Sequence, residues 1–193
     1  MPDIHAPERL ETGRLTLRRP TVRDARTIFA TYASDAEVTR YVGWPRHAHA
    51  SDTRTFVEFS DAEWRKWGAG PYVILHHDTE ALIGSTGLGF ETPTRAATGY
   101  VFARDAWGHG YATEALRAMV DVARNCGVYR LYALCHHEHR ASARVLQKGG
   151  FALEGTLRRY ALFPNLQPPE VCDVLCYSVI FENPSGTEGE MRS

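Results

Sequence analysis

Seven stretches of the chain carry the alternating or continuously apolar pattern that predicts β-strands. They cover residues 15–17, 71–77, 81–90, 98–104, 131–136, 151–163 and 171–180. The polar residues Asp78, Thr79 and Glu80 separate the second and third stretches, which predicts a hairpin there.

Helical spacing of apolar residues is clearest between the fourth and fifth predicted strands. The predicted helix ends at Gly127 and buries Ala112, Ala115, Leu116, Met119, Val120 and Ala123. A shorter helix is predicted over 141–148, where Gly149 and Gly150 stop it.

Three helix starts are predicted between the first and second strands. Thr21 and Asp24 form a capping-box pattern, and the helix that follows would bury Ala25, Ile28, Phe29 and Tyr32. Ser34 with Glu37 repeats that pattern for a short second helix, which Gly43-Trp44-Pro45 ends. Ser51 is predicted to cap a third helix, whose apolar residues are Phe56, Phe59, Trp64 and Trp67.

The order of these elements predicts an α/β fold. Strands come first and are followed by a β-α-β-α-β-β series, so a mixed sheet with helices on both faces is the natural arrangement. One domain is expected over residues 9–182. The tail at 183–193 is polar and rich in Gly, Pro and Ser, and is expected to be disordered.

Composition excludes several classes of protein. The 193 residues carry a formal net charge of -1, without the basic excess that nucleic-acid binders show. No apolar run reaches the ~18 residues of a membrane span, and no secretory signal is recognisable. Cys172 and Cys176 lie about 13 Å apart on one predicted strand, too far to bridge. Unbridged cysteines are typical of a cytoplasmic protein.

The segment from Trp107 to Glu114 leaves a strand and opens the clearest helix. Gly108 and Gly110 allow a tight turn and a close backbone approach, and a helix N-terminus attracts anions. Three readings compete with a diphosphate site of this kind. No Lys-Ser or Lys-Thr follows for a P-loop, Thr113 stands where a Rossmann motif needs its third glycine, and the glycines could simply start a helix without any ligand.

The segment Trp107–Ala115 resembles the acetyl-CoA motif of the GNAT superfamily, and in particular its RimJ/RimL-like group of ribosomal-protein N-terminal acetyltransferases. Further resemblances follow in the family's order over about residues 11–181: Glu11–Arg18, Leu82–Leu88, Gly99-Tyr100, Val145–Phe151, Glu154-Gly155, Asp173 and Tyr177. The resemblance implies a GNAT fold, with a mixed twisted sheet of six to seven strands and a splay between the fourth and fifth.

The resemblance also places acetyl-CoA as the acyl donor. Main-chain groups of Val101, Phe102 and Ala103 would pair with its pantetheine arm, like an added strand. The segment that Trp107 opens would hold the diphosphate, through the residues Gly108, His109, Gly110, Tyr111, Ala112 and Thr113.

The implied reaction is direct acetyl transfer to a primary amine, either a protein N-terminus or a small molecule. Ser142 matches a family serine near the CoA sulfur, where it could protonate the thiolate; alternatively it only satisfies backbone donors of its helix. His139 stands where the family has Asn, and could contact the cofactor, act as a base, or lie free in a loop. The family's acidic base matches Ala161, so Glu91 is its first substitute; Tyr160, Asp173 or a water relay are others.

The acceptor is expected near Trp44 and His47, although Trp44 could equally fill the core. The run His136–His139 lacks the HExxH pattern and neighbouring strand residues face opposite ways, so no metal is expected. Besides the amine acceptor, a second copy of the chain is a possible partner, in a homodimer. Since Ala161 lacks an acid, an acyl-CoA sensor without turnover is the alternative function, and a nucleotide-binding protein of another fold is the third.

Overall fold

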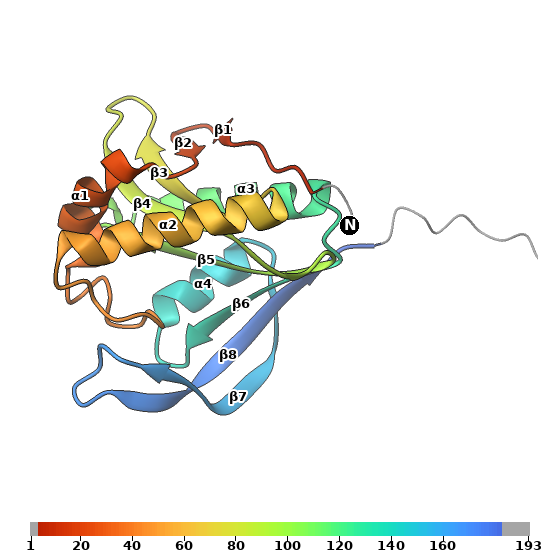
Figure 1. Ribbon diagram of the computed structural model, residues 1–193. Coiled ribbons are helices and arrows are strands. Elements are labelled where there is room, and N and C mark those ends of the chain that lie inside the picture. Colours follow the sequence, from red (N-terminus) through yellow and green to blue (C-terminus); the bar gives the residue numbers. More distant parts are fainter. Residues whose placement is uncertain (1–3, 183–193) are drawn as a thin grey trace, which may run out of the picture.

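Eight strands form one mixed sheet in the computed structural model, which describes residues 4–182 (Figure 1). The strands are β1 (Arg9–Glu11), β2 (Leu15–Arg18), β3 (Pro71–His76), β4 (Leu82–Thr92), β5 (Arg95–Phe102), β6 (Arg130–His136), β7 (Ala152–Phe163) and β8 (Glu170–Ile180). Their order across the sheet is β1-β2-β3-β4-β5-β6-β8-β7. All neighbours are antiparallel except β5 and β6, which are parallel and joined through a helix.

The predicted α/β class is confirmed, and the predicted count of six to seven strands is one short. The additional strand is β1, which pairs Leu10 with Leu17 of β2. Three residues with a single apolar side chain are too few to show a period of two, so the pattern could not reveal this strand.

The helices of the described chain are α1 (Ala25–Ile28), α2 (Ala50–Trp67), α3 (Tyr111–Asn125) and α4 (Arg140–Lys148), with short turns of other helix types beside them. The capping box at Thr21 is confirmed: its N–H donates to Asp24 Oδ2 over 2.7 Å. The helix it opens is broken into a 3-10 turn, α1 and a π-helical turn over Phe29–Ala33.

Two predicted helix starts are wrong in detail. The Ser34 segment forms turns rather than a helix, because Asp35 Oδ1 accepts the N–H groups of Glu37 and Val38 at 2.8 and 3.1 Å. The third helix is capped by His49 and Asp52, and Ser51 lies inside its first turn. A capping aspartate with two acceptor oxygens competes well with a nearby serine.

Phe59 corrects the predicted apolar face of α2. This residue is 55% exposed, whereas Trp64 on the same helix is buried. Phe56 and Trp67 are half-buried. The helix therefore buries a narrower stripe than its aromatic residues suggested.

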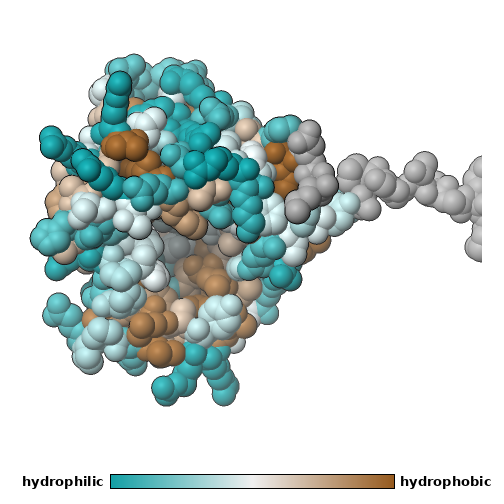
Figure 2. Space-filling model, viewed as in Figure 1, coloured by the Kyte–Doolittle hydropathy of each residue, from teal (hydrophilic) through white to brown (hydrophobic). Residues whose placement is uncertain are grey.

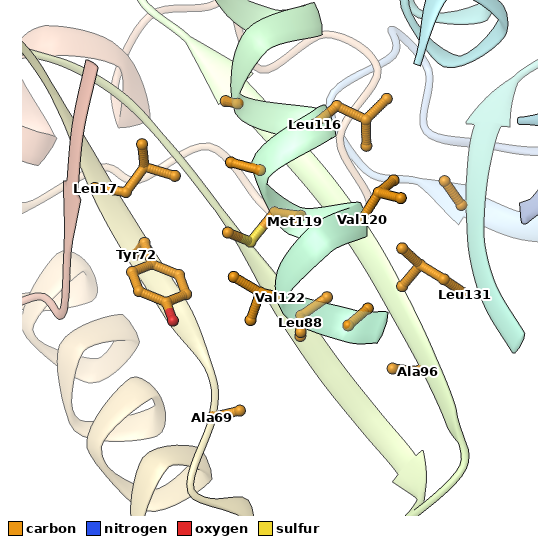
Figure 3. Close-up of a cluster of buried hydrophobic side chains, with 14 of the residues drawn as sticks. Leu17, Ala69, Tyr72, Leu88, Ala96, Leu116, Met119, Val120, Val122 and Leu131 are labelled. Atoms are coloured by element: carbon orange, nitrogen blue, oxygen red, sulfur yellow. The ribbon is translucent and has the colours of Figure 1, made fainter. Parts of the chain in front are cut away.

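Besides a small cluster of Phe163, Cys172 and Val174 in the β7–β8 hairpin, the core of the described residues has two parts, one on each face of the sheet. Neighbouring residues of β3 divide between them: Val73 packs with Ile28 and Val57 from α1 and α2, whereas Ile74 packs on the side of α3. Figure 3 shows α3 laid over the sheet, with Met119 on the side of Leu17 and Tyr72. Because α3 is fixed in this way, the loop at its N-terminus has a defined place beside β5.

All four cysteines are unbridged, which confirms the prediction for Cys172 and Cys176. Within residues 4–182, no helix has the length and apolar character that a bilayer span requires. The predicted disordered tail at 183–193 lies outside the described residues.

Candidate active site

The parallel pair β5 and β6 stays together for only part of its length. Pairing covers Arg95 with Arg130, Ala96 with Leu131 and Ala97 with Tyr132, and then stops. β5 continues to Phe102 against β4, and β6 continues to His136 against β8. Beyond this point β5 stays with β4 and β6 stays with β8, so a gap opens between residues 98–102 and 133–136.

Alternate residues of β5 turn their main-chain groups toward this gap. The N–H of Ala103 donates to Ile83 O over 2.8 Å, and Val101 stands opposite Ser85. In an antiparallel ladder the residues between such bonded positions point the other way. Thr98, Tyr100 and Phe102 therefore face the gap.

This alternation changes the expected contacts of the pantetheine arm. Of the predicted trio Val101, Phe102 and Ala103, only Phe102 faces the gap; the other two are directed at β4. The carbonyl of Phe102 accepts a hydrogen bond from Trp107 Nε1 over 2.9 Å. Its N–H remains directed at the gap, and Trp107 is fixed beside it with 43% of its surface exposed.

A glycine turn leads from β5 into α3. Gly108 and Gly110 have φ angles of +80° and +82°, a region that favours glycine. A Cβ added at Gly108 would meet no atom within 4 Å, so the loop faces open space. The first helical bond of α3 runs from Glu114 N–H to Gly110 O over 3.2 Å. The N–H groups of Tyr111, Ala112 and Thr113 precede it and form the positive end of the helix.

Ser142 and Tyr100 join α4 to β5 beside the gap. Ser142 Oγ lies 3.0 Å from Tyr100 Oη, which also donates to the Ser142 carbonyl over 3.1 Å. The N-cap of α4 is His139, so Ser142 does not cap the helix. Burial raises the pKa of Tyr100 and holds its hydroxyl protonated. The pair is a hydrogen-bond donor system next to the unpaired edge of β5.

Tyr41 packs against His136, the last residue of β6, and against His139, the N-cap of α4. The Tyr41 ring lies 4.6 Å from the ring of His136 and 5.0 Å from that of His139. Burial lowers the pKa of both histidines. Charge repulsion from His137 lowers the pKa of His136 further, and repulsion from His136 does the same to His139. His139 is therefore a neutral imidazole at pH 7, half-buried rather than free in a loop.

The stability of the protein is expected to fall as the pH drops below about 6.5, the ordinary value for histidine. His136 and His139 resist protonation in the folded chain, so the unfolded chain binds more protons in this range. The two histidines contribute fully to the free energy of unfolding above the ordinary histidine pKa. This contribution is lost as the pH falls toward their pKa in the folded chain. Urea unfolding at pH 7.5 and 5.5 measures how much of the free energy of unfolding is lost on acidification. His139→Asn should lose less than the wild-type protein. An equal loss in the two proteins would contradict the assignment of this pH dependence to His139.

Glu91 lies at the closed end of the gap. It occupies a bulge in β4, between the paired residues Phe90 and Thr92. One carboxylate oxygen accepts from the hydroxyl of Tyr132, and the other contacts Arg95 Nε at 2.6 Å. These contacts lower the pKa of Glu91, the hydrogen bond from Tyr132 being the strongest cause. Glu91 is thus ionised, and Tyr132 connects it to the last paired position of β5 and β6.

The surface is hollowed between the part of the molecule that carries α2 and the β7–β8 hairpin, and hydrophobic residues line the hollow (Figure 2). β5 and β6 run between these two parts (Figure 1). β5 is uncovered at Gly99, because a Cβ added there would meet no atom within 4 Å. Leu134 and Tyr132 lie on the face opposite the core residue Leu131. The hollow therefore reaches the gap from the side opposite α3.

Trp44 and His47 lie in the loop that leads to α2. Trp44 packs against the core cluster of α1 and α2, in agreement with the alternative that this residue fills the core. His47 Nδ1 lies 2.8 Å from Thr53 Oγ1. Neither side chain is joined to the residues of the gap by a hydrogen bond that the described structure shows.

Asn165, in the β7–β8 loop, is a residue that the sequence did not single out. Its Nδ2 donates to the carbonyls of Thr39 and Trp44 at 2.7 and 2.9 Å, and its Oδ1 accepts from Arg46 N–H at 2.8 Å. The hairpin is thereby tied to the loop before α2, closing one side of the hollow. A lone loop asparagine carries no sequence signal for a contact 119 residues away.

The described residues contain no group of three or more His, Cys, Asp or Glu side chains placed to hold a metal ion. In the run that begins at His136, that ring packs on Tyr41, His137 and Phe163. Its environment is an aromatic cluster.

Comparison with known proteins gives a consistent result. A sequence family described as an acetyltransferase (GNAT) domain matches residues 14–152. YoaA of Bacillus subtilis (strain 168), described as an uncharacterized N-acetyltransferase, is 33% identical over 174 residues, which cover 89% of this chain and 96% of that protein.

Solved structures share the fold at lower identity. RimL, a ribosomal L7/L12 alpha-N-protein acetyltransferase solved with coenzyme A, superposes with a TM-score of 0.78 at 21% identity, covering 90% of this chain and 98% of that one. MccE, a microcin C7 self-immunity acetyltransferase solved with acetyl-CoA and AMP, has a TM-score of 0.80 at 19% identity, covering 92% and 99%.

Proposed function

Because the chain belongs to the acetyltransferase (GNAT) family and is an N-acetyltransferase, we propose that it transfers acetyl from acetyl-CoA to a primary amine by direct attack within a ternary complex. The observation that carries this proposal is the gap between β5 and β6 beside the glycine turn of α3. An unpaired strand edge and a helix N-terminus together match the two polar parts of CoA, its amides and its diphosphate.

The donor is held mainly by main-chain groups. The diphosphate lies against the N–H groups of residues 108–113, where the open space at Gly108 admits it. The pantetheine amides pair with the gap-facing groups of Thr98, Tyr100 and Phe102. Side-chain identity therefore matters most at the two glycines.

The acceptor approaches from the hollow, opposite the donor. Its neutral nitrogen attacks the thioester carbonyl carbon, the C–S bond breaks, and an amide and a CoA thiolate result. Ser142 hydrogen-bonds to the departing sulfur, and Tyr100 orients its hydroxyl. The nitrogen loses one proton and the thiolate gains one, so the products are the acetylated amine and CoA.

We assign the base to Glu91 in preference to His139. Glu91 is ionised, and its partner Tyr132 lies where the strands separate, on the side of the hollow. His139 lies beyond the other end of β6, at the N-cap of α4, and packs against the Tyr41 ring. Glu91→Gln should lower kcat about 100-fold, whereas His139→Asn should change it less than about fivefold. The reverse order of the two effects would move the base to His139.

The acceptor is a protein N-terminus or a small primary amine. The hollow is apolar on its walls and open on one side, which suits an amine with hydrophobic neighbours. RimL acts on a protein N-terminus and MccE was solved with AMP, so both kinds of acceptor belong in the test.

The decisive experiment measures thiol release from acetyl-CoA with a panel of amines: N-terminal peptides, polyamines, aminoglycosides and aminoacyl compounds. We expect CoA release that depends on one class of acceptor. Thermal stabilisation by acetyl-CoA with no release on any amine favours the sensor function. Stabilisation by ATP or NAD but not by CoA points to a nucleotide-binding protein instead.

Ser142→Ala is expected to lower kcat about tenfold or more and to change the dissociation constant of CoA less than about threefold. The lost hydroxyl acts on the departing sulfur and leaves the diphosphate contacts intact. Tyr100→Phe should reproduce part of the loss, since it frees the Ser142 hydroxyl to rotate. Steady-state kinetics and calorimetry test both variants; wild-type turnover of Ser142→Ala would make this serine a structural residue.

A further inference from the structure

Glu114, in the first turn of α3, binds the turn that precedes β2. One of its carboxylate oxygens accepts from Thr12 Oγ1 at 2.6 Å and from Arg14 N–H at 2.8 Å. The other accepts from Arg14 Nε at 2.8 Å and lies 2.7 Å from Arg14 Nη2. Burial alone would raise the pKa of Glu114, but these hydrogen bonds outweigh it and keep the carboxylate ionised.

The Arg14 guanidinium continues from Glu114 to the glycine turn. Its Nη1 donates to the carbonyl of His109 over 2.9 Å, and its carbon lies 4.6 Å above the Tyr111 ring. One planar group thus contacts a carboxylate of the helix and a carbonyl of the loop. The distance from Arg14 Nη2 to the position of a Cβ on Gly110 would be 3.6 Å, so the guanidinium lies close behind this glycine.

This contact fixes the direction of one amide. In a trans peptide the C=O and N–H groups point in opposite directions. Because the His109 carbonyl points at Arg14, the N–H of Gly110 in the same peptide unit points away from it. That direction is the one a bound anion needs, since Arg14 occupies the other side of the loop.

We propose that Arg14 and Glu114 are positioning residues of the donor site, which hold the His109–Gly110 peptide so that its N–H faces the diphosphate. This inference rests on the proposed function. The two charges neutralise each other in their ion pair, so their effect lies in geometry rather than in attraction of the phosphates. Arg14 and Glu114 would act through the loop and not touch the reacting atoms.

Three variants test the proposal by calorimetry with CoA. Glu114→Gln and Arg14→Met should each raise the dissociation constant about tenfold or more, the usual effect of losing charge-assisted hydrogen bonds. Arg14→Lys should not restore affinity, because an ammonium cannot reach both Glu114 and the His109 carbonyl in a fixed fork. With an accepted amine, KM for acetyl-CoA should rise while kcat at saturation stays within about twofold.

The matched control is Asp121→Asn on the same helix, which removes a carboxylate paired with Arg124 on the exposed side. It should leave CoA affinity unchanged. Variants that bind CoA as wild type does, or an Arg14→Lys protein that regains what Arg14→Met loses, would overturn the positioning role while leaving the transferase proposal intact. A wild-type protein that does not bind CoA would defeat the proposed function itself.

Discussion

Gly110→Asp is expected to raise the dissociation constant of CoA at least about 100-fold. Gly110 has a φ of +82°, which an aspartate adopts only with strain. The new carboxylate would add a negative charge to the first turn of α3 and so oppose a bound diphosphate. Its Cβ would lie 3.6 Å from Arg14 Nη2, on the side of the loop away from the diphosphate, so the carboxylate would also compete with the His109 carbonyl for the guanidinium.

Gly127→Asp provides a matched control for this prediction. Gly127 has a φ of +77° and open space around its Cβ position, but it lies at the other end of α3. It should lose comparable stability and keep its affinity for CoA. Calorimetry on both variants, with melting temperatures, separates strain from loss of the site. Unchanged CoA affinity in Gly110→Asp would remove the assignment of the glycine turn.

Leu116→Ala is expected to lower the free energy of unfolding by about 3–4 kcal/mol, the usual cost of a cavity at a closely packed leucine. Leu116 is 0% exposed and is labelled on α3 in Figure 3. Its Cδ2 lies only 2.5 Å from the position that a Cβ on Gly149 would take, so the end of α4 packs directly on it. Little room exists for collapse around the missing atoms.

Urea unfolding measures this loss against Leu153→Ala, the same substitution at a residue that is 53% exposed. The exposed variant should lose less than about 1 kcal/mol. Equal losses in the two variants would mean that α3 and α4 do not depend on this contact. Because α3 carries the glycine turn, the cavity variant should also bind CoA more weakly near its melting range.

The sequence predicted those parts of the fold that repeated a local pattern. The apolar spacing in α3 and the glycines at positions 108 and 110 placed a helix N-terminus after a strand, as observed. The strands from Pro71 onward were found within a few residues of their bounds. The pattern failed at Ser34 and Ser51, where Asp35 and the pair His49–Asp52 provide stronger caps.

The gap and its contacts depend on pairing between distant residues, which local patterns do not encode. The direction of each main-chain group in β5 follows from its register with β4, so Thr98 could not be distinguished from Val101 by sequence alone. The bulge at Glu91 and the ties of Asn165 have the same origin. The turn at Arg14 is far from the glycine turn in sequence, and only the fold brings the two together.

The most direct test is a calorimetric titration of the wild-type protein with CoA and, separately, with pantetheine, which lacks the diphosphate and the adenosine. We predict that CoA binds with a dissociation constant between about 1 μM and 1 mM and that pantetheine binds at least about tenfold more weakly. Equal affinity for the two compounds, or no heat from CoA at millimolar concentration, would contradict the claim that the first amides of α3 hold a diphosphate.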